Sequence, residues 1–331
     1  MLNIVVDAMG GDNAPSAIIE GAVRAANEFD IKVTLVGDEK IIRQELLDYK
    51  GGKIDIVNTT EIIDCNEESV KAIRTKKDSS IVVGMKMVAD GAGDAFVSAG
   101  SSGAVIAGSS LIIKRINGVR RAGLGIVLPA LDKPVLLLDC GANSDCTPEF
   151  LTQFAVMGTA YMKSLFDLDK PAVALLNNGA EEHKGSRLYK ESYQLLKQTP
   201  VNFVGNIEAR YVLSGVADVV VADGFAGNVF IKTTEGVAKH FSTLLKGVFK
   251  KNIFTMLASL VLLDGIKNMK KSFDYTEYGG APVLGAEKVV IKAHGSSNSK
   301  AIYSAIKQAK NFAENNVIET IKNNLKKSLD E

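Results

Sequence analysis

The stretch Leu2-Asn-Ile-Val-Val-Asp-Ala-Met-Gly-Gly-Asp-Asn-Ala-Pro15 joins an apolar run to an acidic, glycine-rich turn. The run at residues 2–6 predicts a buried strand, and Pro15 suits the first turn of a helix that begins near Ser16. Ligands of open α/β sheets bind at the carboxyl ends of strands, and the turn lies at such an end. The stretch therefore favours an α/β enzyme with a ligand site here.

A second Gly-Gly loop, Tyr278-Gly-Gly-Ala-Pro-Val-Leu-Gly285, repeats the Gly-Gly and Ala-Pro elements of the first. Adjacent glycines let the backbone approach a substrate without interference from a Cβ atom. Carboxylates facing a bound anion would repel it, so we expect Asp7 and Asp12 to organise their loop or a neighbouring lysine. The residues expected to shape the substrate cleft are Asp7, Gly10, Gly11, Asp12, Asn143, Asp223, Gly279 and Gly280.

The composition is that of a globular protein without a strong net electrostatic field. The chain has 331 residues, and its 39 basic and 38 acidic side chains leave a formal charge of +1. This balance gives no general attraction for nucleic acid. Three cysteines are too few for a disulfide framework and indicate a reducing, cytoplasmic location, and the spacing of Cys140 and Cys146 does not support a metal site.

Apolar strands and helix-length segments alternate along most of the chain, which predicts one α/β domain over residues 1–331. The sheet is expected to be mixed but mostly parallel, covered by helices on both faces, with an antiparallel hairpin at residues 125–128 and 135–139. We expect the polar strand ends to cluster at one edge of the sheet. The strands are predicted at 2–6, 32–36, 54–57, 95–98, 125–128, 135–139, 172–176, 201–204, 219–222 and 289–292.

A small-residue loop, Ser98-Ala-Gly-Ser-Ser-Gly103, follows one predicted strand and precedes a helix. Hydroxyl groups and free backbone N–H groups at a helix N-terminus bind anions, which predicts a phosphate site. The alternative is an ordinary helix N-cap built from small residues. The candidate phosphate-binding residues are Ser98, Gly100, Ser101, Ser102 and Gly103.

Three further strand ends supply candidate catalytic groups. Lys184 beside Gly185 can offer a point charge to phosphate or to an oxyanion, and Asn228 can donate its amide. His294 is the one histidine in a Gly/Ser-rich strand end. Structural roles remain open for each: a solvated lysine, an Asn N-cap and a structural histidine.

Several common site patterns are absent from the sequence. It has no G-x-G-x-x-G, no Walker lysine loop, no G-x-S-x-G elbow and no His-x4-Asp pair. Dinucleotide, nucleoside triphosphate and serine-hydrolase chemistry therefore lose support.

Residues from about 229 to 271 form a long helical pattern without a strand signal. Between Lys239 and Lys271 the segment has seven lysines against one acid, around an eleven-residue apolar run at 253–263. The run is too short to cross a bilayer but suits an anionic membrane surface, a dimer contact or both, and the lysines suit an acidic carrier protein. The candidate membrane residues are Phe254, Leu257, Leu260 and Val261.

Taken together, these loops resemble the bacterial phosphate acyltransferase family of phospholipid synthesis. The matching segments run in order along nearly the whole chain. Where the family reads Ser-Ala-Gly-Asn-Thr-Gly, this chain has Ser101 and Ser102, so one amide donor is replaced by a hydroxyl. The segments are residues 7–15, 98–104, 138–143, 176–185, 223–229, 278–285 and 294–297.

The resemblance implies a three-layer α/β/α sandwich like that of isocitrate and isopropylmalate dehydrogenases. It implies a homodimer at the inner face of the cell membrane, and it matches Lys184 and Asn228 to positions important for activity. The family reaction moves a long acyl chain from acyl carrier protein to inorganic phosphate and needs no cofactor. A metal-dependent dehydrogenase of the same fold and a non-enzymatic scaffold that binds acyl carrier protein at a membrane are the alternatives.

Overall fold

The ten predicted strands and one further strand assemble into one sheet within the residues that the structure describes. In this computed structural model those residues are 1–252, 254–256, 262, 265 and 279–330. The order across the sheet is β3-β2-β1-β4-β11-β10-β5-β6-β9-β7-β8. The strands are β1 Leu2–Asp7, β2 Ile31–Gly37, β3 Lys53–Asn58, β4 Ala95–Ser98, β5 Gly123–Leu128, β6 Val135–Leu138, β7 Ala172–Asn177, β8 Asn202–Glu208, β9 Val219–Val221, β10 Ala281–Leu284 and β11 Val289–Lys292.

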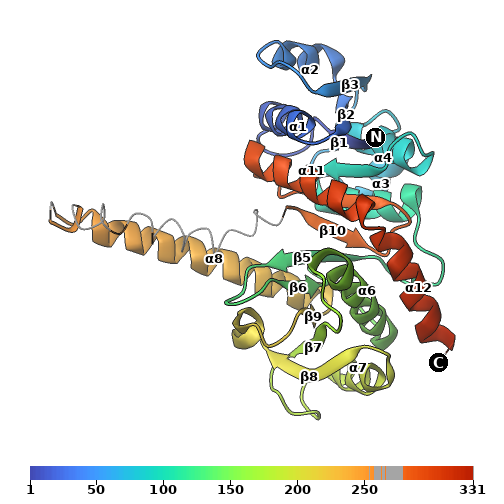
Figure 1. The fold of residues 1–331 in the computed structure, drawn as a ribbon, viewed down its shortest axis with the longest axis vertical. Coiled ribbons are helices and arrows are strands. Elements are labelled where there is room, and N and C mark those ends of the chain that lie inside the picture. Colours follow the sequence, from blue (N-terminus) through green and yellow to red (C-terminus); the bar gives the residue numbers. More distant parts are fainter. Residues whose placement is uncertain (253, 257–261, 263–264, 266–278, 331) are drawn as a thin grey trace.

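Helices cover both faces of this sheet (Figure 1). Short polar side chains cap the start of some of them. The Asp223 carboxylate, for example, accepts a hydrogen bond from the backbone N–H of Ala226 at 2.8 Å and so starts α8. The helices are α1 Ser16–Glu28, α2 Glu39–Leu46, α3 Ser69–Thr75, α4 Ser80–Ala89, α5 Ser102–Gly108, the π-helix η1 Ser109–Ile113, α6 Pro148–Phe166, α7 Arg187–Gln198, the 3₁₀-helix η2 Ala209–Ser214, α8 Gly224–Phe249, α11 Ser299–Glu314 and α12 Val317–Asp330.

The core differs between the two faces of the sheet. On the first face, strand residues such as Ile4 and Leu136 join α1, α6, α11 and α12 in one continuous apolar cluster. On the second face, Val5 belongs to a cluster with α3, α4 and α5, whereas Leu137 belongs to another cluster with η2 and α8. Ile126 of β5 packs partly against both, so the second face is divided at β5.

The mostly parallel, mixed sheet and the β5–β6 hairpin confirm the predicted architecture. Seven of the ten strand pairings are parallel, and the antiparallel ones are β11–β10, β10–β5 and β5–β6. The expectation of one shared edge was wrong. Because the direction reverses between β5 and β6, the strands β6, β9 and β7 end at the edge opposite to the ends of β1, β4 and β11.

The second Gly-Gly motif contains a strand that sequence patterns did not predict. Ala281–Leu284 forms β10 in the middle of the sheet, although Pro282 argues against a central strand. Pro282 lies opposite Ile291 of β11, and the pairing with β5 begins only at Val283. The proline is therefore outside the ladder that joins β10 to β5.

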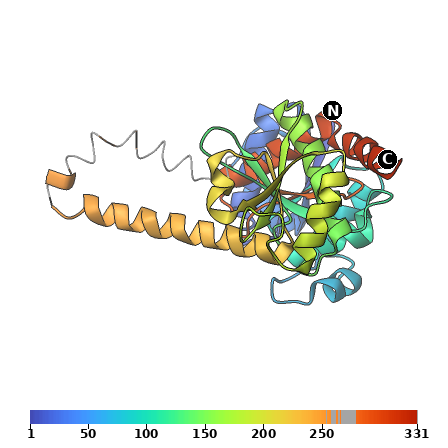
Figure 2. The same ribbon diagram turned by 90° about the horizontal axis from the view of Figure 1, so that it is seen from below.

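The predicted helical excursion begins earlier than expected. Helix α8 starts at Gly224 rather than near residue 229, and it runs without interruption for 26 residues. Figure 2 shows it projecting well away from the body of the protein. Its first turns therefore belong to the sheet's second face, and its later turns extend into solvent.

Candidate active site

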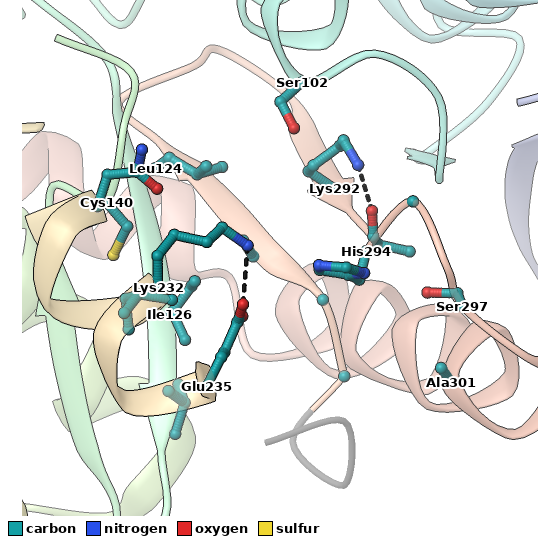
Figure 3. Close-up of a pocket in the computed structure, with 18 residues that line it drawn as sticks. Ser102, Leu124, Ile126, Cys140, Lys232, Glu235, Lys292, His294, Ser297 and Ala301 are labelled. Carbon is teal, nitrogen blue, oxygen red and sulfur yellow. Dashed lines mark hydrogen bonds and ion pairs between the residues drawn. The ribbon is translucent and has the colours of Figure 1, made fainter. Parts of the chain in front are cut away.

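A cavity of about 170 Å³ lies where the second face is divided (Figure 3). Its walls come from β5 and α8 on one side, and from α5, β11 and the second Gly-Gly loop on the other. Residues more than 190 positions apart in sequence thus meet at one place. The polar side chains on its lining are Ser102, Asn228, Lys232, Glu235, Lys292, His294 and Ser297.

Lys292 is a buried cation at the end of β11. Its side chain is buried, with 6% of the residue exposed, and its ammonium donates to the carbonyl oxygens of Ala99 (3.4 Å) and Ala293. The ion pairs of the described residues do not include it. Burial lowers the pKa of Lys292 to about 8, and nearby negative groups, Asp7 among them, oppose that shift. A buried cation without an ion-pair partner suits an anionic ligand.

His294 follows two residues later and lies between Lys292 and the side chains of α8 in Figure 3. The Ser296 backbone N–H donates to its Nδ1 at 3.2 Å, so Nδ1 is an acceptor and the neutral ring carries its proton on Nε2. Burial, followed by the positive charge of Lys232, lowers the pKa of His294. A neutral imidazole at neutral pH can donate one hydrogen bond from Nε2.

Helix α8 presents three polar side chains to the cavity. Asn228 lies in its second turn, so Asp223 rather than Asn228 is the N-cap. Lys232 and Glu235 form an ion pair of 2.8 Å and reach toward His294 (Figure 3). Asp223 also accepts a 2.6 Å hydrogen bond from the Tyr189 hydroxyl, which ties the start of α8 to α7.

The predicted phosphate loop contributes one side chain to the lining. The Ser98 hydroxyl donates to Asp7 at 2.7 Å and accepts from the Gly100 N–H, and Ser101 caps α5. Only Ser102 of this loop lines the cavity, among the described residues. The N-cap interpretation therefore fits Ser101, and Ser98 orders the loop from behind.

The first Gly-Gly loop lies behind the cavity lining rather than on it. Asp7 is fully buried, which raises its pKa, while hydrogen bonds from Ser80 and Ser98 act in the opposite direction. A Cβ on Gly10 would lie 2.7 Å from the backbone nitrogen of Gly100, so the two loops pack backbone against backbone. Asp12 donates its backbone N–H to the Gly295 oxygen at 2.8 Å. The Asp7 carboxylate thus holds the two loops together, whereas Asp12 contributes a backbone hydrogen bond, and the role predicted for its carboxylate stays a prediction.

Gly279 and Gly280 do line the cavity, and the Gly280 N–H donates to Gln308 at 2.8 Å. A Cβ on Gly280 would lie 2.7 Å from the Lys292 carbonyl oxygen, so a larger residue would displace β11. Asn143 is away from the lining. Its side-chain amide donates to Ala122 and Asp139, and its carbonyl accepts from Gly224, so it joins β5, β6 and α8.

Lys184 is exposed in the loop after β7 and is not among the cavity-lining residues. Its side chain lies against Gly179, where an added Cβ would be 3.0 Å from the Lys184 Cγ. Its catalytic role stays a prediction. Of the candidate membrane residues, Phe254 is 78% exposed, and Leu257, Leu260 and Val261 lie outside the described residues.

Sequence patterns missed Lys292, Lys232 and Glu235. A signal for Lys292 was present, because side chains alternate along a strand and Lys292 shares the face of Val290, which packs on the divided side. On α8, Asn228, Ile231 and Glu235 are three and four positions apart and so share one face. Neither signal indicates a site until the opposite wall is known.

No group of three or more His, Cys, Asp or Glu side chains among the described residues is arranged to hold a metal ion. No helix in that part of the chain combines the length and the apolar character needed to cross a membrane.

Solved structures with this fold include enzymes of two kinds. A phosphotransacetylase from Streptococcus pyogenes is 20% identical, with a TM-score of 0.63 over 96% of this chain and 94% of that one. A 4-hydroxythreonine-4-phosphate dehydrogenase from Klebsiella pneumoniae is 13% identical, with a TM-score of 0.52 over 94% and 99% of the two chains. At these identities the likeness concerns the fold alone.

Sequence relatives are much closer. A phosphate acyltransferase from Thermoanaerobacter pseudethanolicus is 46% identical over 100% of this chain and 99% of its own. One from Thermoanaerobacterium thermosaccharolyticum is 49% identical over 97% and 96% of the two chains. The family model described as "Fatty acid synthesis protein" matches residues 2–320. The chain therefore belongs to the phosphate acyltransferase family of fatty acid synthesis proteins and is an acyltransferase.

Proposed function

We propose that the protein transfers a long acyl chain from acyl carrier protein to inorganic phosphate and so supplies acyl phosphate for phospholipid synthesis. The cavity carries the proposal, because it combines a buried cation with neutral hydrogen-bond donors. Such a set suits an anion that reacts with a polar carbonyl. Family membership independently supports an acyl group as one substrate.

In this mechanism phosphate binds beside Lys292 and the Ser102 hydroxyl. The Asn228 amide and the His294 Nε2–H donate to the thioester oxygen as negative charge develops on it. Glu235, the carboxylate on the lining, is neutralised by Lys232 and does not repel phosphate strongly. Lys184 remains a proposed second cation that assists from the neighbouring loop.

The chemistry requires no acyl-enzyme intermediate. A phosphate oxygen attacks the thioester carbon, the carbon–sulfur bond breaks, and the proton of hydrogen phosphate passes to the leaving thiolate. Cys140 lines the cavity, but burial raises the pKa of its thiol well above the usual value, so it stays protonated and a weak nucleophile. Direct attack by phosphate therefore suits this site.

Purified protein should release free thiol from long-chain acyl carrier protein only when inorganic phosphate is present, with one acyl phosphate formed per thiol. Arsenate in place of phosphate should also release thiol, because it is a similar anionic nucleophile. Thiol release at the same rate without either anion would overturn the proposal. The same assay excludes a scaffold role if turnover is observed.

The exposed lysines of the projecting helix are the proposed docking surface for acyl carrier protein. Lys239, Lys246, Lys250 and Lys251 are exposed along the later half of α8 and just beyond it. A positive surface attracts an acidic partner and accelerates its encounter. Changing Lys246 and Lys250 to Glu should raise KM for acyl carrier protein and leave KM for phosphate unchanged; equal effects on both would contradict this.

A homodimer is proposed through an apolar seam on α8. Val237, Phe241, Leu244 and Val248 are between 49% and 63% exposed and follow the 4-3-4 spacing of paired helices. A second copy of the helix would cover this seam. Sedimentation of the Phe241→Asp protein should then show monomers, and an unchanged species at the same concentration would refute this seam.

Contact with an anionic membrane at the cytoplasmic side is proposed for the end of the excursion. Phe254 is exposed beyond the lysines of α8, which is the arrangement of a peripheral membrane contact. Phe254→Glu should weaken binding to vesicles that contain anionic lipid. Equal binding by the variant would count against this contact.

A further inference from the structure

We propose that an apolar groove along α8 binds the acyl chain and sets the chain length that the enzyme prefers. The groove has a volume of about 340 Å³ and is bounded by Leu128, Pro129, Leu213 and Ala238, among others. It shares Ile126, Ile231, Glu235 and His294 with the candidate active site. The inference rests on the proposed function, since it assigns the tail of the same substrate.

The small size of the cavity favours such a second compartment. At about 170 Å³ it is smaller than the roughly 300 Å³ at which pockets for drug-sized ligands begin. Phosphate and the thioester group fit a small, polar cavity, but a long hydrocarbon tail does not. The groove begins at the residues beside His294, where the tail has to leave the reacting carbon.

One face of α8 connects the two compartments. Asn228, Ile231, Glu235 and Ala238 follow one another at spacings of three and four, so they lie in a row along the helix. Ten residues from Asn228 to Ala238 correspond to a rise of about 15 Å. With carbon–carbon bonds of about 1.5 Å in a zigzag, this is the length of roughly twelve methylene groups.

The charged groups of the groove do not oppose an apolar guest. Glu235 is paired with Lys232 at the junction with the cavity. Lys239 is exposed at the other end, where its ammonium can remain in water while its methylene stem lies on the groove. Between them, Ile231, Ala238 and Leu213 provide an apolar surface that favours hydrocarbon over water.

The groove is also separate from the proposed dimer seam. At 100° per residue, the row from Asn228 to Ala238 is centred about 130° around α8 from the seam that contains Val237 and Phe241. A second α8 bound to the seam would therefore leave the groove open. A molecule bound in the groove would therefore compete with the acyl chain of the substrate and not with a second copy of the protein.

The decisive experiment is to narrow the groove with Ala238→Phe. Steady-state kinetics are measured with acyl carrier protein that carries either an eight-carbon or a sixteen-carbon chain, at saturating phosphate. The ratio of kcat/KM for the long chain to that for the short chain should fall at least tenfold, because the ring occupies the space of the distal carbons. Thr234→Leu, a second lining position, should lower the same ratio by a smaller factor.

Thr243→Phe is the matched control, because Thr243 is an exposed residue of α8 outside both linings. Its chain-length ratio should equal that of the unchanged protein. An unaltered ratio in both Ala238→Phe and Thr234→Leu, in proteins that still turn over the short chain, would overturn the groove. Failure of the unchanged protein to form any acyl phosphate would instead overturn the proposed function.

Discussion

The two faces of the sheet use the same strands for different purposes. On the first face, α1, α11, α6 and α12 form a continuous core across both halves of the sheet. On the second face, the core is interrupted at β5, and the candidate active site occupies the interruption. Alternate residues of one strand thus face either the continuous core or the candidate active site, which predicts that substitutions on the two faces have different consequences.

The largest effect is expected on the free energy of unfolding, from a cavity made in the continuous core of the first face. Phe154 of α6 is fully buried in its cluster. Phe154→Ala should lower the free energy of unfolding by about 3–5 kcal/mol, because it removes buried surface and leaves a cavity. Urea unfolding measures the loss. The turnover per folded molecule should change less than twofold, whereas a large loss of kcat at full folding would break the comparison between the faces.

Leu131→Ala is the control for this prediction. Leu131 is 82% exposed in the β5–β6 loop, so its truncation should change the unfolding free energy by less than about 0.5 kcal/mol.

On the divided face, Lys292→Met should have the opposite effect: activity should fall and stability should not. Loss of the ammonium should reduce kcat/KM for phosphate by about 100-fold, or about 2.7 kcal/mol, if it stabilises the reacting anion. Stability should not fall and can rise, because a buried charge is replaced by an apolar chain of similar shape. Phosphate kinetics and urea unfolding on the same sample test both parts. Lost stability with unchanged kinetics would make Lys292 a structural residue.

Titration of Lys292 should make the activity depend on pH, which tests its proposed role as the cation that binds phosphate. Burial lowers its pKa to about 8, so the cation is present below that pH and is lost above it. The value of kcat/KM for phosphate should therefore fall as pH rises through about 8. In Lys292→Arg the fall should disappear from this range, since guanidinium remains protonated. An identical alkaline limb in the variant would assign the titration to another group.

Much of the fold follows from local patterns, because alternating apolar strands and helical crossovers specify a covered sheet. Strand β10 was missed because Gly279, Gly280 and Pro282 signal a turn, and only pairing with β11 and β5 turns the segment into a central strand. The reversal of strand direction after β5 was not predictable from local patterns either. The sequence showed a hairpin at residues 125–139, but its position in the middle of the sheet depends on distant strands.

Part of the cavity lining was predictable, namely where a loop motif itself lines the cavity, as with Ser102, Asn228, Gly280 and His294. Motifs could not separate lining residues from supporting ones, because both need glycines and short polar side chains. Ser98, for example, donates to the buried Asp7. Lys292 belongs to a strand and not to a loop, and it is a candidate because it is buried, which depends on the packing of the whole second face.

A smaller effect is expected from Lys184, the lysine that the motifs favoured. It is exposed outside the lining, so its charge acts across more water than that of Lys292. Lys184→Ala should lower kcat about tenfold, or about 1.4 kcal/mol, if the charge stabilises the transition state. Lys190→Ala, at an exposed lysine of α7, is the control. Wild-type turnover in Lys184→Ala would remove Lys184 from the mechanism and leave Lys292 as the proposed cation.

The smallest effect is expected from Cys140, and it tests whether every residue that lines the cavity takes part in the reaction. Cys140 lines the cavity, and its thiol donates to the Leu137 carbonyl oxygen at 3.2 Å. Since its raised pKa keeps the thiol protonated, Cys140→Ala should change kcat less than threefold, and no acyl group should remain on the protein after mixing with acyl carrier protein alone. A trapped acyl-enzyme, absent in the variant, would replace direct attack by phosphate with a covalent mechanism. It would also mean that the surroundings of the cavity activate the buried Cys140 thiol, whereas burial in the continuous core of the first face would leave a thiol unreactive.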